Sequence, residues 1–298
     1  MVAKAGNLAG SKKNRIIKIE IQETSFQNMV KTRITEEDKI HIALASRHHN
    51  VIYCLDGKRL LKVKESCEPE IIVTEGTEII CDGAFQGNKN VRKVTIPSTV
   101  RAIGKYAFKD CENLQYISIP ETVTEIPIEC FKDCHNLSNV EWHNGITSIW
   151  DSAFENCWAL RSISFPSQLR SIYDRAFTLS ALETFEPTIA EGVKCLIHER
   201  AFSFCPNLKK ATLSPGVRLA GMMSFIYCEN LEEVVFTEEG QGLPGPVETM
   251  LIGCNKLKKI IVPAPVTENK YNFNSEKWDT GSFGHCNYNH IVVMSEPK

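Results

Sequence analysis

The sequence has no long apolar run. Nothing in its 298 residues approaches the roughly 20 consecutive apolar residues that a membrane-spanning helix needs. Residues 1 to 18 also lack the apolar core of a secretory signal peptide. We therefore expect no membrane insertion and, for the chain as written, a cytoplasmic location. A leader trimmed from the front would leave the same start, so export stays open.

Charge of one sign is not in excess either. The formal net charge is −2 and the isoelectric point is about 6.5, so no global basic field draws the chain to nucleic acid. A small basic excess precedes the first acidic residue, Glu20, and we interpret residues 1–14 as a flexible, solvated tail. Its members and neighbours are Lys4, Lys12, Lys13, Arg15 and Lys18. We expect no nucleic-acid partner.

Motifs of known chemistry are also missing. The sequence contains no P-loop, no nucleophile elbow and no H-E-x-x-H metalloprotease motif. None of its twelve cysteines forms a C-x-x-C pair, and the sharpest metal candidate, Cys130 and Cys134 with His135, has no second pair at zinc-finger spacing. We expect no metal, no cofactor and no catalysis. An enzyme acting on peptide or glycan stays as a remote alternative.

What the sequence does have is a period of 23 residues. Seven phenylalanines are separated by 23, 23, 23, 23, 25 and 23 residues, and Leu251 takes the next place after 26. Three residues after the phenylalanine stands a cysteine in five of the seven units, and again after Leu251. The phenylalanines are Phe85, Phe108, Phe131, Phe154, Phe177, Phe202 and Phe225, and the cysteines are Cys111, Cys134, Cys157, Cys205, Cys228 and Cys254.

Each unit continues with a strand pattern. Six residues after the phenylalanine begins an L-x-x-I-x-I run, such as Leu114, Ile117 and Ile119, whose last two apolar residues flank a polar one. One unit cannot bury its own apolar side, so the units must stack, with parallel strands about 4.8 Å apart. The pattern predicts a solenoid with internal columns of Phe, Leu and Cys. At such an inward position a free cysteine behaves as a small apolar residue, so we expect reduced, shielded thiols.

The repeat resembles the BspA-like leucine-rich repeats, whose 23-residue units read L-x-x-I-x-I-P-x-x-V-x-x-I-G-x-x-A-F-x-x-C. The stretch from Leu114 to Cys134, LQYISIPETVTEIPIECFKDC, matches at nearly every apolar place. The resemblance implies a leucine-rich-repeat solenoid of stacked β-containing repeats with parallel strands, an N-terminal α+β cap and a C-terminal cap. It also implies a role in adhesion to other proteins, at the cell surface or secreted if a leader was trimmed.

The ends of the chain carry signals of their own. Thr35 reads as the N-cap of a short helix that runs to about Arg47, and Asp56-Gly57 lies between two apolar runs as the turn of a β-hairpin. We interpret the chain as a tail (1–14), an N-terminal cap with this helix and hairpin (15–66), a repeat array (67–263) and a C-terminal cap (264–298).

Two places depart from the repeat. Pro187 replaces the last apolar residue of the strand in the fifth unit, and the seventh unit contains the loop GQGLPGP at residues 240–246. We expect the stacking geometry to deviate at these two points.

Surface aromatics are the candidate partner-binding residues. Trp150 and Tyr173 hold the same repeat position, four before the phenylalanine, and Trp158 lies on a nearby loop. Exposed Trp and Tyr are enriched at interface hot spots, although packing between neighbouring loops would explain the pair equally well. The outward strand positions, among them Tyr116 and Glu141, form a second candidate surface.

The function that we predict is therefore a non-catalytic protein-binding module, used for adhesion or recognition, with a protein partner. A structural or adaptor subunit of a larger assembly is the alternative, since repeat families carry many different partners on one scaffold.

Overall fold

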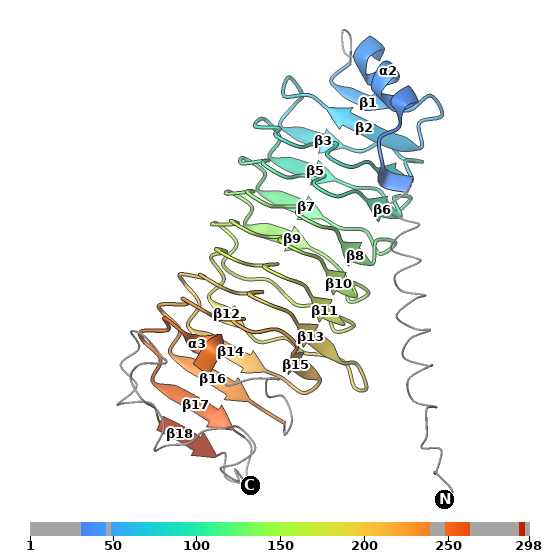
Figure 1. Cartoon of the computed structure of the whole chain (residues 1–298). Coiled ribbons are helices and arrows are strands. Elements are labelled where there is room, and N and C mark those ends of the chain that lie inside the picture. Colours follow the sequence, from blue (N-terminus) through green and yellow to red (C-terminus); the bar gives the residue numbers. More distant parts are fainter. Residues whose placement is uncertain (1–30, 46–48, 239–247, 263–291, 296–298) are drawn as a thin grey trace, which may run out of the picture.

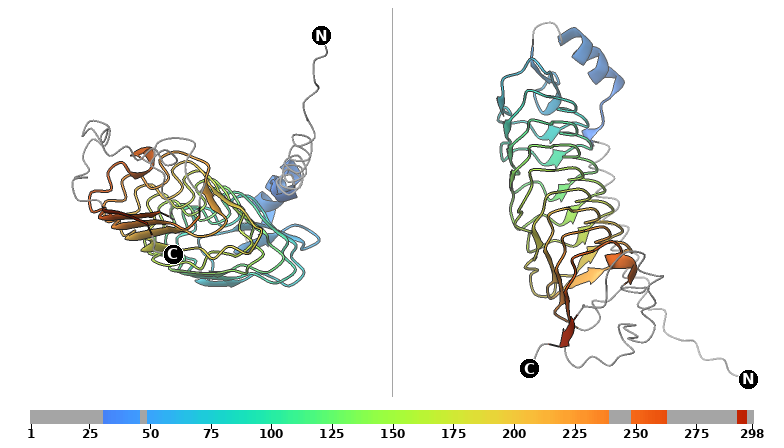
Figure 2. Two further views of the ribbon diagram at one scale, coloured as in Figure 1. Left: turned by 90° about the horizontal axis from the view of Figure 1, so that it is seen from below. Right: turned by 90° about the vertical axis from the view of Figure 1, so that its left-hand side faces the viewer.

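The computed structural model describes residues 31–45, 49–238, 248–262 and 292–295. The chain winds as one elongated stack of turns, with helix α2 at one end and strand β18 at the other (Figures 1 and 2). Parallel strands of neighbouring units form two ladders that run along the stack. This arrangement confirms the predicted solenoid of leucine-rich repeats.

The first ladder contains the strands of the L-x-x-I-x-I runs. Its N-terminal part has the order β3-β5-β7-β9, and its C-terminal part has the order β12-β14-β16-β17-β18. The strands are β3 (Glu70–Ile72), β5 (Lys93–Thr95), β7 (Tyr116–Ser118), β9 (Asn139–Glu141), β12 (Thr184–Phe185), β14 (Lys210–Leu213), β16 (Glu233–Phe236), β17 (Lys259–Val262) and β18 (Val292–Ser295).

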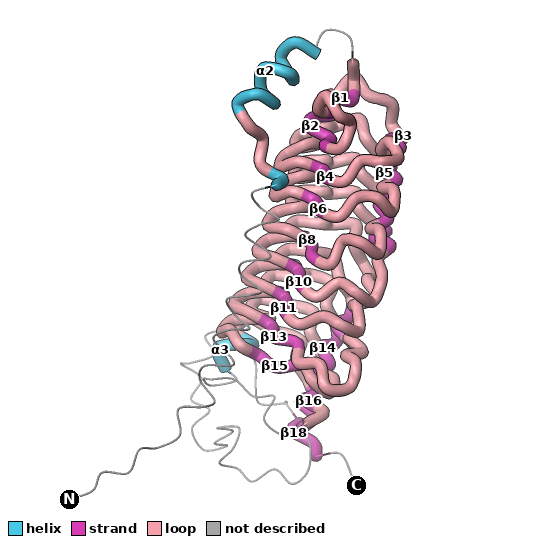
Figure 3. Tube along the Cα trace, turned by 90° about the vertical axis from the view of Figure 1, so that its right-hand side faces the viewer, coloured by secondary structure: helices cyan, strands magenta, loops and turns pink. Residues whose placement is uncertain are grey.

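The second ladder contains the N-terminal hairpin and the short strands that precede the phenylalanines, and Figure 3 shows them in a line along one side of the stack. Its two parts have the orders β1-β2-β4-β6 and β15-β13-β11-β10-β8. The strands are β1 (Val51–Tyr53), β2 (Arg59–Val63), β4 (Ile79–Ile80), β6 (Ala102–Ile103), β8 (Glu125–Ile126), β10 (Ser148–Ile149), β11 (Ser171–Ile172), β13 (Cys195–Ile197) and β15 (Val217–Leu219).

The register of the ladders follows the sequence period. Lys93 pairs with Tyr116 and Tyr116 pairs with Asn139, each 23 residues further on. Likewise Ser148 pairs with Ser171 in the second ladder. A residue therefore lies beside the residues at the same repeat position in the units before and after it, and each repeat position becomes a row along the stack.

The first ladder is interrupted in the fourth unit, where residues 161–166 form no strand. In the preceding unit Trp142 occupies a place that an aliphatic residue usually holds, and its indole Nε1 donates to the carbonyl of Ser164 at 2.5 Å. That bond satisfies a carbonyl that a ladder partner would otherwise satisfy. We expected the deviation at Pro187, one unit later; there the ladder has resumed as the two-residue strand β12. The other expected deviation, at 240–246, lies outside the described residues.

The phenylalanines form a continuous buried column. All seven side chains are fully buried. The ring centroids of successive members are 4.6 to 5.4 Å apart, and the rings are nearly parallel in every pair. The predicted inward column is confirmed. Parallel offset rings at this spacing add an aromatic attraction to the burial of their apolar area.

We name the tight turn around each phenylalanine the Phe turn. Some of its backbone amides donate to the next unit, and others donate to carbonyls of the same turn. The amides of Tyr106, Phe108 and Asp110 donate to carbonyls of the next unit at 2.9 to 3.1 Å. The amides of Lys109 and Cys111, which lie between and after them, donate back within their own turn at 3.0 and 3.1 Å. The buried backbone of the Phe turn is thus satisfied partly by its own turn and partly by its neighbour.

This pattern of bonds places two residues of every Phe turn in the left-handed backbone region. They stand two before and two after the phenylalanine, and their φ angles lie between 49° and 76° in every unit. Glycine fills both places in the first unit, as Gly83 and Gly87. Most other units have residues with a side chain there, for which this backbone conformation costs about 1 kcal/mol or more. The stacking of the solenoid evidently outweighs that cost.

The N-terminal end of the stack carries the helix and hairpin of the sequence prediction. Helix α2 (Glu36–Ala45) begins directly after Thr35, whose hydroxyl accepts from the amide of Asp38 at 3.1 Å. The carboxyl group of Asp38 then bonds the guanidinium of Arg59 at 2.9 Å and ties the helix to β2. Strands β1 and β2 are antiparallel around Gly57.

The assignment of domain boundaries stays a proposal. The predicted tail, residues 1–14, lies outside the described residues. Of the predicted cap (264–298), only β18 is described, and it extends the first ladder by pairing in parallel with β17. The short helix α3 (Glu248–Leu251) precedes that end of the ladder.

Removing one member of the Phe column should destabilise the fold strongly. We expect Phe131→Ala to lower the free energy of unfolding by about 3–5 kcal/mol, because it leaves a cavity between two stacked rings. Phe131→Leu, which keeps most of the volume, should cost clearly less. Urea unfolding followed by circular dichroism measures both. Equal and small losses would show that the column contributes little.

Candidate functional site

The cysteines of the repeat are the first candidates for chemistry, and the structure gives them a structural role. Each thiol Sγ donates to the carbonyl of the phenylalanine in the preceding unit; in the pair Cys111 and Phe85 the distance is 3.1 Å. The same bond recurs at 3.0 to 3.3 Å for Cys134, Cys157, Cys205, Cys228 and Cys254. The inward, buried position is confirmed. The role of the thiol as a donor was not anticipated.

Burial also makes the thiols of Cys111 and Cys134 poor nucleophiles. Burial raises the pKa of Cys111 to about 12 and that of Cys134 well above its usual value, so neither forms a thiolate at neutral pH. The eleven cysteines within the described ranges are free thiols. No group of three or more metal-binding side chains occurs among the residues that the structure describes, and Cys130 is itself fully buried.

We expect the column thiols to resist labelling in the native protein. A bulky thiol reagent should leave Cys111, Cys134 and Cys157 unmodified until denaturant is added, whereas the partly exposed Cys54 should react first. Peptide mapping by mass spectrometry after timed labelling measures this. Rapid native labelling of the column would contradict the buried hydrogen-bonded arrangement.

The raised thiol pKa values predict a loss of stability at alkaline pH. Above about pH 9 the thiols of the unfolded chain lose their protons while the buried thiols keep theirs, so the unfolded state binds fewer protons and the free energy of unfolding falls. Each buried thiol whose pKa is raised contributes a slope of up to about 1.4 kcal/mol per pH unit. The variant Cys111→Ser/Cys157→Ser should show a shallower decline in urea unfolding between about pH 8 and about pH 10.5. An unchanged slope would contradict this assignment.

The candidate aromatics Trp150 and Tyr173 do come together. Their rings are parallel with centroids 4.2 Å apart, and Trp150 Nε1 donates to a carboxyl oxygen of Glu125 at 3.0 Å. His198 continues the stack at 4.7 Å from Tyr173. Because each inner ring face is covered by the next ring, this aromatic stack presents edges to solvent. The sequence reasoning missed His198, which would have been found by counting four residues back from Phe202.

Trp158 belongs to a separate stack. Its indole lies parallel to the imidazole of His135 in the preceding unit, with centroids 4.0 Å apart. Unlike Trp150, it is 59% exposed. The three candidate aromatics therefore divide into one half-buried pair, Trp150 and Tyr173, and one exposed indole.

The outward face of the first ladder is bonded within itself. The hydroxyl of Tyr116 donates to a carboxyl oxygen of Glu141, and Lys93 Nζ lies 5.5 Å from the centre of the Tyr116 ring. Further along, Lys210 forms ion pairs with Glu186 and Glu233 at 2.7 and 3.8 Å. The polar and charged side chains of neighbouring strands therefore pair with one another along the ladder.

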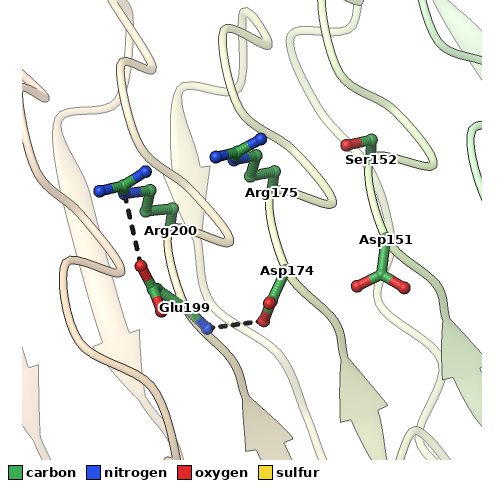
Figure 4. A pocket seen from close by; sticks show the side chains of 6 residues that line it. All are labelled: Asp151, Ser152, Asp174, Arg175, Glu199 and Arg200. Carbon is green, nitrogen blue, oxygen red and sulfur yellow. Dashed lines mark hydrogen bonds and ion pairs between the residues drawn. The ribbon is translucent and has the colours of Figure 1, made fainter.

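A cleft of about 390 Å³ opens on the Phe turns of the fourth to sixth units. Figure 4 shows its carboxyl groups in a row, with the two guanidinium groups on one side of them. The lining residues are Asp151, Ser152, Asp174, Arg175, Glu199 and Arg200. Burial, together with the neighbouring charge of Asp174, raises the pKa of Asp151. Its three carboxyl and two guanidinium groups are suited to binding charged groups.

Within the described ranges, no helix has the length and apolar character needed to cross a bilayer. The stacked parallel ladders and the buried Phe column together define a leucine-rich-repeat solenoid. The model of the BspA type leucine-rich-repeat region matches residues 65–183 and 186–287 in six copies. The chain belongs to the BspA type leucine-rich-repeat family, whose repeat proteins are generally non-catalytic and are associated with protein interaction or adhesion.

Several solved structures share the repeat. A leucine-rich cell surface protein from Faecalibacterium prausnitzii A2-165 is 20% identical over 73% of this chain and 87% of its own, with a TM-score of 0.34. The T. pallidum leucine-rich repeat protein is 19% identical over 72% and 79%, with a TM-score of 0.34. A leucine-rich repeat protein from Bacteroides ovatus ATCC 8483 is 17% identical over 84% and 99%, with a TM-score of 0.30. No curated protein matches the chain.

Proposed function

We propose that the chain is a non-catalytic module that binds a protein partner. The partner contacts the turns of the middle repeats, with Trp158 as a principal contact. The proposal is based on the exposure and order of the Trp158 side chain. It is 59% exposed, and the parallel imidazole of His135 holds it in one orientation. A large ring that is already ordered loses little conformational entropy when a partner covers it.

The half-buried pair Trp150 and Tyr173 supports this contact in a different way. Each directly precedes an aspartate that lines the cleft, and the two rings stack between neighbouring units. We propose that a partner touches the edges of these rings, while most of their buried area serves packing. Tyr116 and Glu141 on the first ladder form the second candidate surface.

Replacing Trp158 should separate affinity from stability. We expect Trp158→Ala to weaken the partner by over about 2 kcal/mol, or roughly thirtyfold, because a covered indole is lost. Its unfolding temperature should stay near that of the unmodified chain, because the side chain is mostly exposed. Proteins captured from the source cells by the intact chain identify the partner, and calorimetry with the purified partner gives the affinity.

Leu55→Ala is the matched control, since Leu55 is 85% exposed at the distant β1–β2 turn. It should leave the affinity unchanged. If Trp158→Ala binds normally and Trp150→Ala or Tyr173→Ala only lowers the unfolding temperature, the aromatics are packing residues. The first-ladder surface around Tyr116 would then be the place to search.

A further inference from the structure

Three apolar side chains form a line on the Phe turns of the fifth to seventh units. Leu179, Phe204 and Tyr227 hold the same repeat position, two after the phenylalanine, and are 39%, 43% and 42% exposed. Backbone hydrogen bonds join their turns in sequence: the amide of Leu179 donates to Ser203, and that of Phe204 donates to Ile226. We name this line the apolar ridge.

The apolar ridge occupies the costly left-handed position of the turn. Its three residues have φ angles of 58°, 56° and 57°. Glycine, aspartate and asparagine tolerate that region best, and they fill the same position in the other units, as Gly87, Asp110, Asp133, Asn156 and Gly253. Large apolar residues are disfavoured in this backbone conformation. They are also unusual in an exposed turn, where polar residues are common. Such a conflict between local preference and native conformation is typical of functional sites.

The spacing of the apolar ridge matches that of an α-helix. The rings of Phe204 and Tyr227 are stacked with centroids 4.9 Å apart, and the buried rings beneath them are spaced at 5.3 and 5.4 Å. An α-helix rises about 5.4 Å per turn, so apolar side chains three or four residues apart recur at the same interval. A helix lying along the solenoid axis would set one apolar side chain against each unit.

The C-terminal end of the ridge is packed against the next turn. The ring of Tyr227 lies over Gly253, where an added Cβ would come within 2.2 Å of Tyr227 Cδ1. Glycine therefore allows this ring to lie flat against the next turn. The end of the ridge is shaped by backbone packing and not by a flexible side chain.

Two guanidinium groups accompany the ridge on the same turns, on one side of the row of carboxyl groups that also lines the cleft (Figure 4). Arg175 and Arg200 stand four residues before Leu179 and Phe204, and both line the cleft. Arg200 contacts Glu199 at 3.6 Å, whereas Arg175 is exposed and makes no ion pair with any residue that the structure describes. A partner whose apolar stripe covers the ridge would place its neighbouring side chains beside these guanidinium groups, which favours carboxylates there.

We propose that the apolar ridge is the docking site for an amphipathic α-helix of a partner protein, with acidic residues beside its apolar stripe. The helix lies along the solenoid axis, its apolar residues at i, i+3 or i+4, and i+7 cover Leu179, Phe204 and Tyr227, and its carboxylates face Arg175 and Arg200. This inference rests on the proposed protein-binding function and names the chemistry of the partner.

Two synthetic helices test the proposal directly. Both are about 18 residues long, long enough to hold a helix when stapled, with leucine at the i, i+3, i+7 stripe; one carries glutamate and the other lysine beside the stripe. Fluorescence anisotropy with the full chain should show the glutamate helix binding at least roughly tenfold more tightly than the lysine helix. The variant Arg175→Glu/Arg200→Glu should reverse that order. Equal binding of the two helices, or no binding of either, would overturn the proposal.

The ridge itself is tested by Leu179→Asn/Phe204→Asn/Tyr227→Asn. Asparagine tolerates the left-handed region, so the unfolding temperature should be unchanged or raised, while the glutamate helix should bind at least roughly tenfold more weakly. The control Ile72→Asn, at a 79% exposed apolar residue on β3, should bind normally. A lowered unfolding temperature with unchanged binding would overturn the proposal, since the ridge would then be a packing feature.

Two further outcomes separate this proposal from the protein-binding function. If the unmodified chain self-associates in analytical ultracentrifugation and the triple asparagine variant does not, a second copy covers the ridge and the helix proposal falls. If the purified natural partner loses affinity with Trp158→Ala and keeps it with the triple variant, the module binds protein at Trp158 and the ridge proposal alone is wrong.

Discussion

The structure depends on the hydrogen bonds that join one Phe turn to the next. Every second amide of the turn donates to the neighbouring unit, and the thiol three residues after the phenylalanine donates to the phenylalanine carbonyl of the unit before. These bonds hold the turns at the spacing at which phenylalanine rings stack. They also explain the composition of the repeat: a small residue precedes the ring, and cysteine supplies a compact apolar side chain with one donor. In the fifth unit Ser180 takes the place of that cysteine.

The same constraint creates the surface on which function is proposed. Alternation of bonds within and between turns requires two left-handed residues in each unit, and a side chain at such a residue projects from the tight turn. Since register is strict, each of these positions becomes a row. The cleft, on the Phe turns of the fourth to sixth units, and the apolar ridge, on those of the fifth to seventh, are thus rows on overlapping sets of turns, and both keep the backbone register of the repeat.

Periodicity made the fold predictable, because a repeat displays its buried positions many times over. The Phe column, the inward cysteines, the parallel strands and the N-cap at Thr35 all followed from residue spacing. The left-handed positions could not be predicted: residues as different as Tyr106, Asp133 and Leu179 occupy them, and the preference for glycine is overridden by stacking. The break in the first ladder at residues 161–166 depends on where one indole, that of Trp142, points. The predicted contacts were the aromatics four before the phenylalanine, a loop tryptophan and the outward strand positions, whereas the ridge lies two after the phenylalanine, where most units have Gly, Asp or Asn.

In a solenoid each unit contacts only its neighbours, so the energetic effect of a surface residue stays local. Units five to seven can therefore hold Leu179, Phe204 and Tyr227 at strained positions without weakening the N-terminal units, whose equivalent residues are Gly87, Asp110 and Asp133. A scaffold that tolerates strain in one segment lets recognition residues accumulate there while the internal columns stay intact. Specificity in this chain is then expected where the surface rows depart from the repeat, and the departures concentrate in the fifth to seventh units.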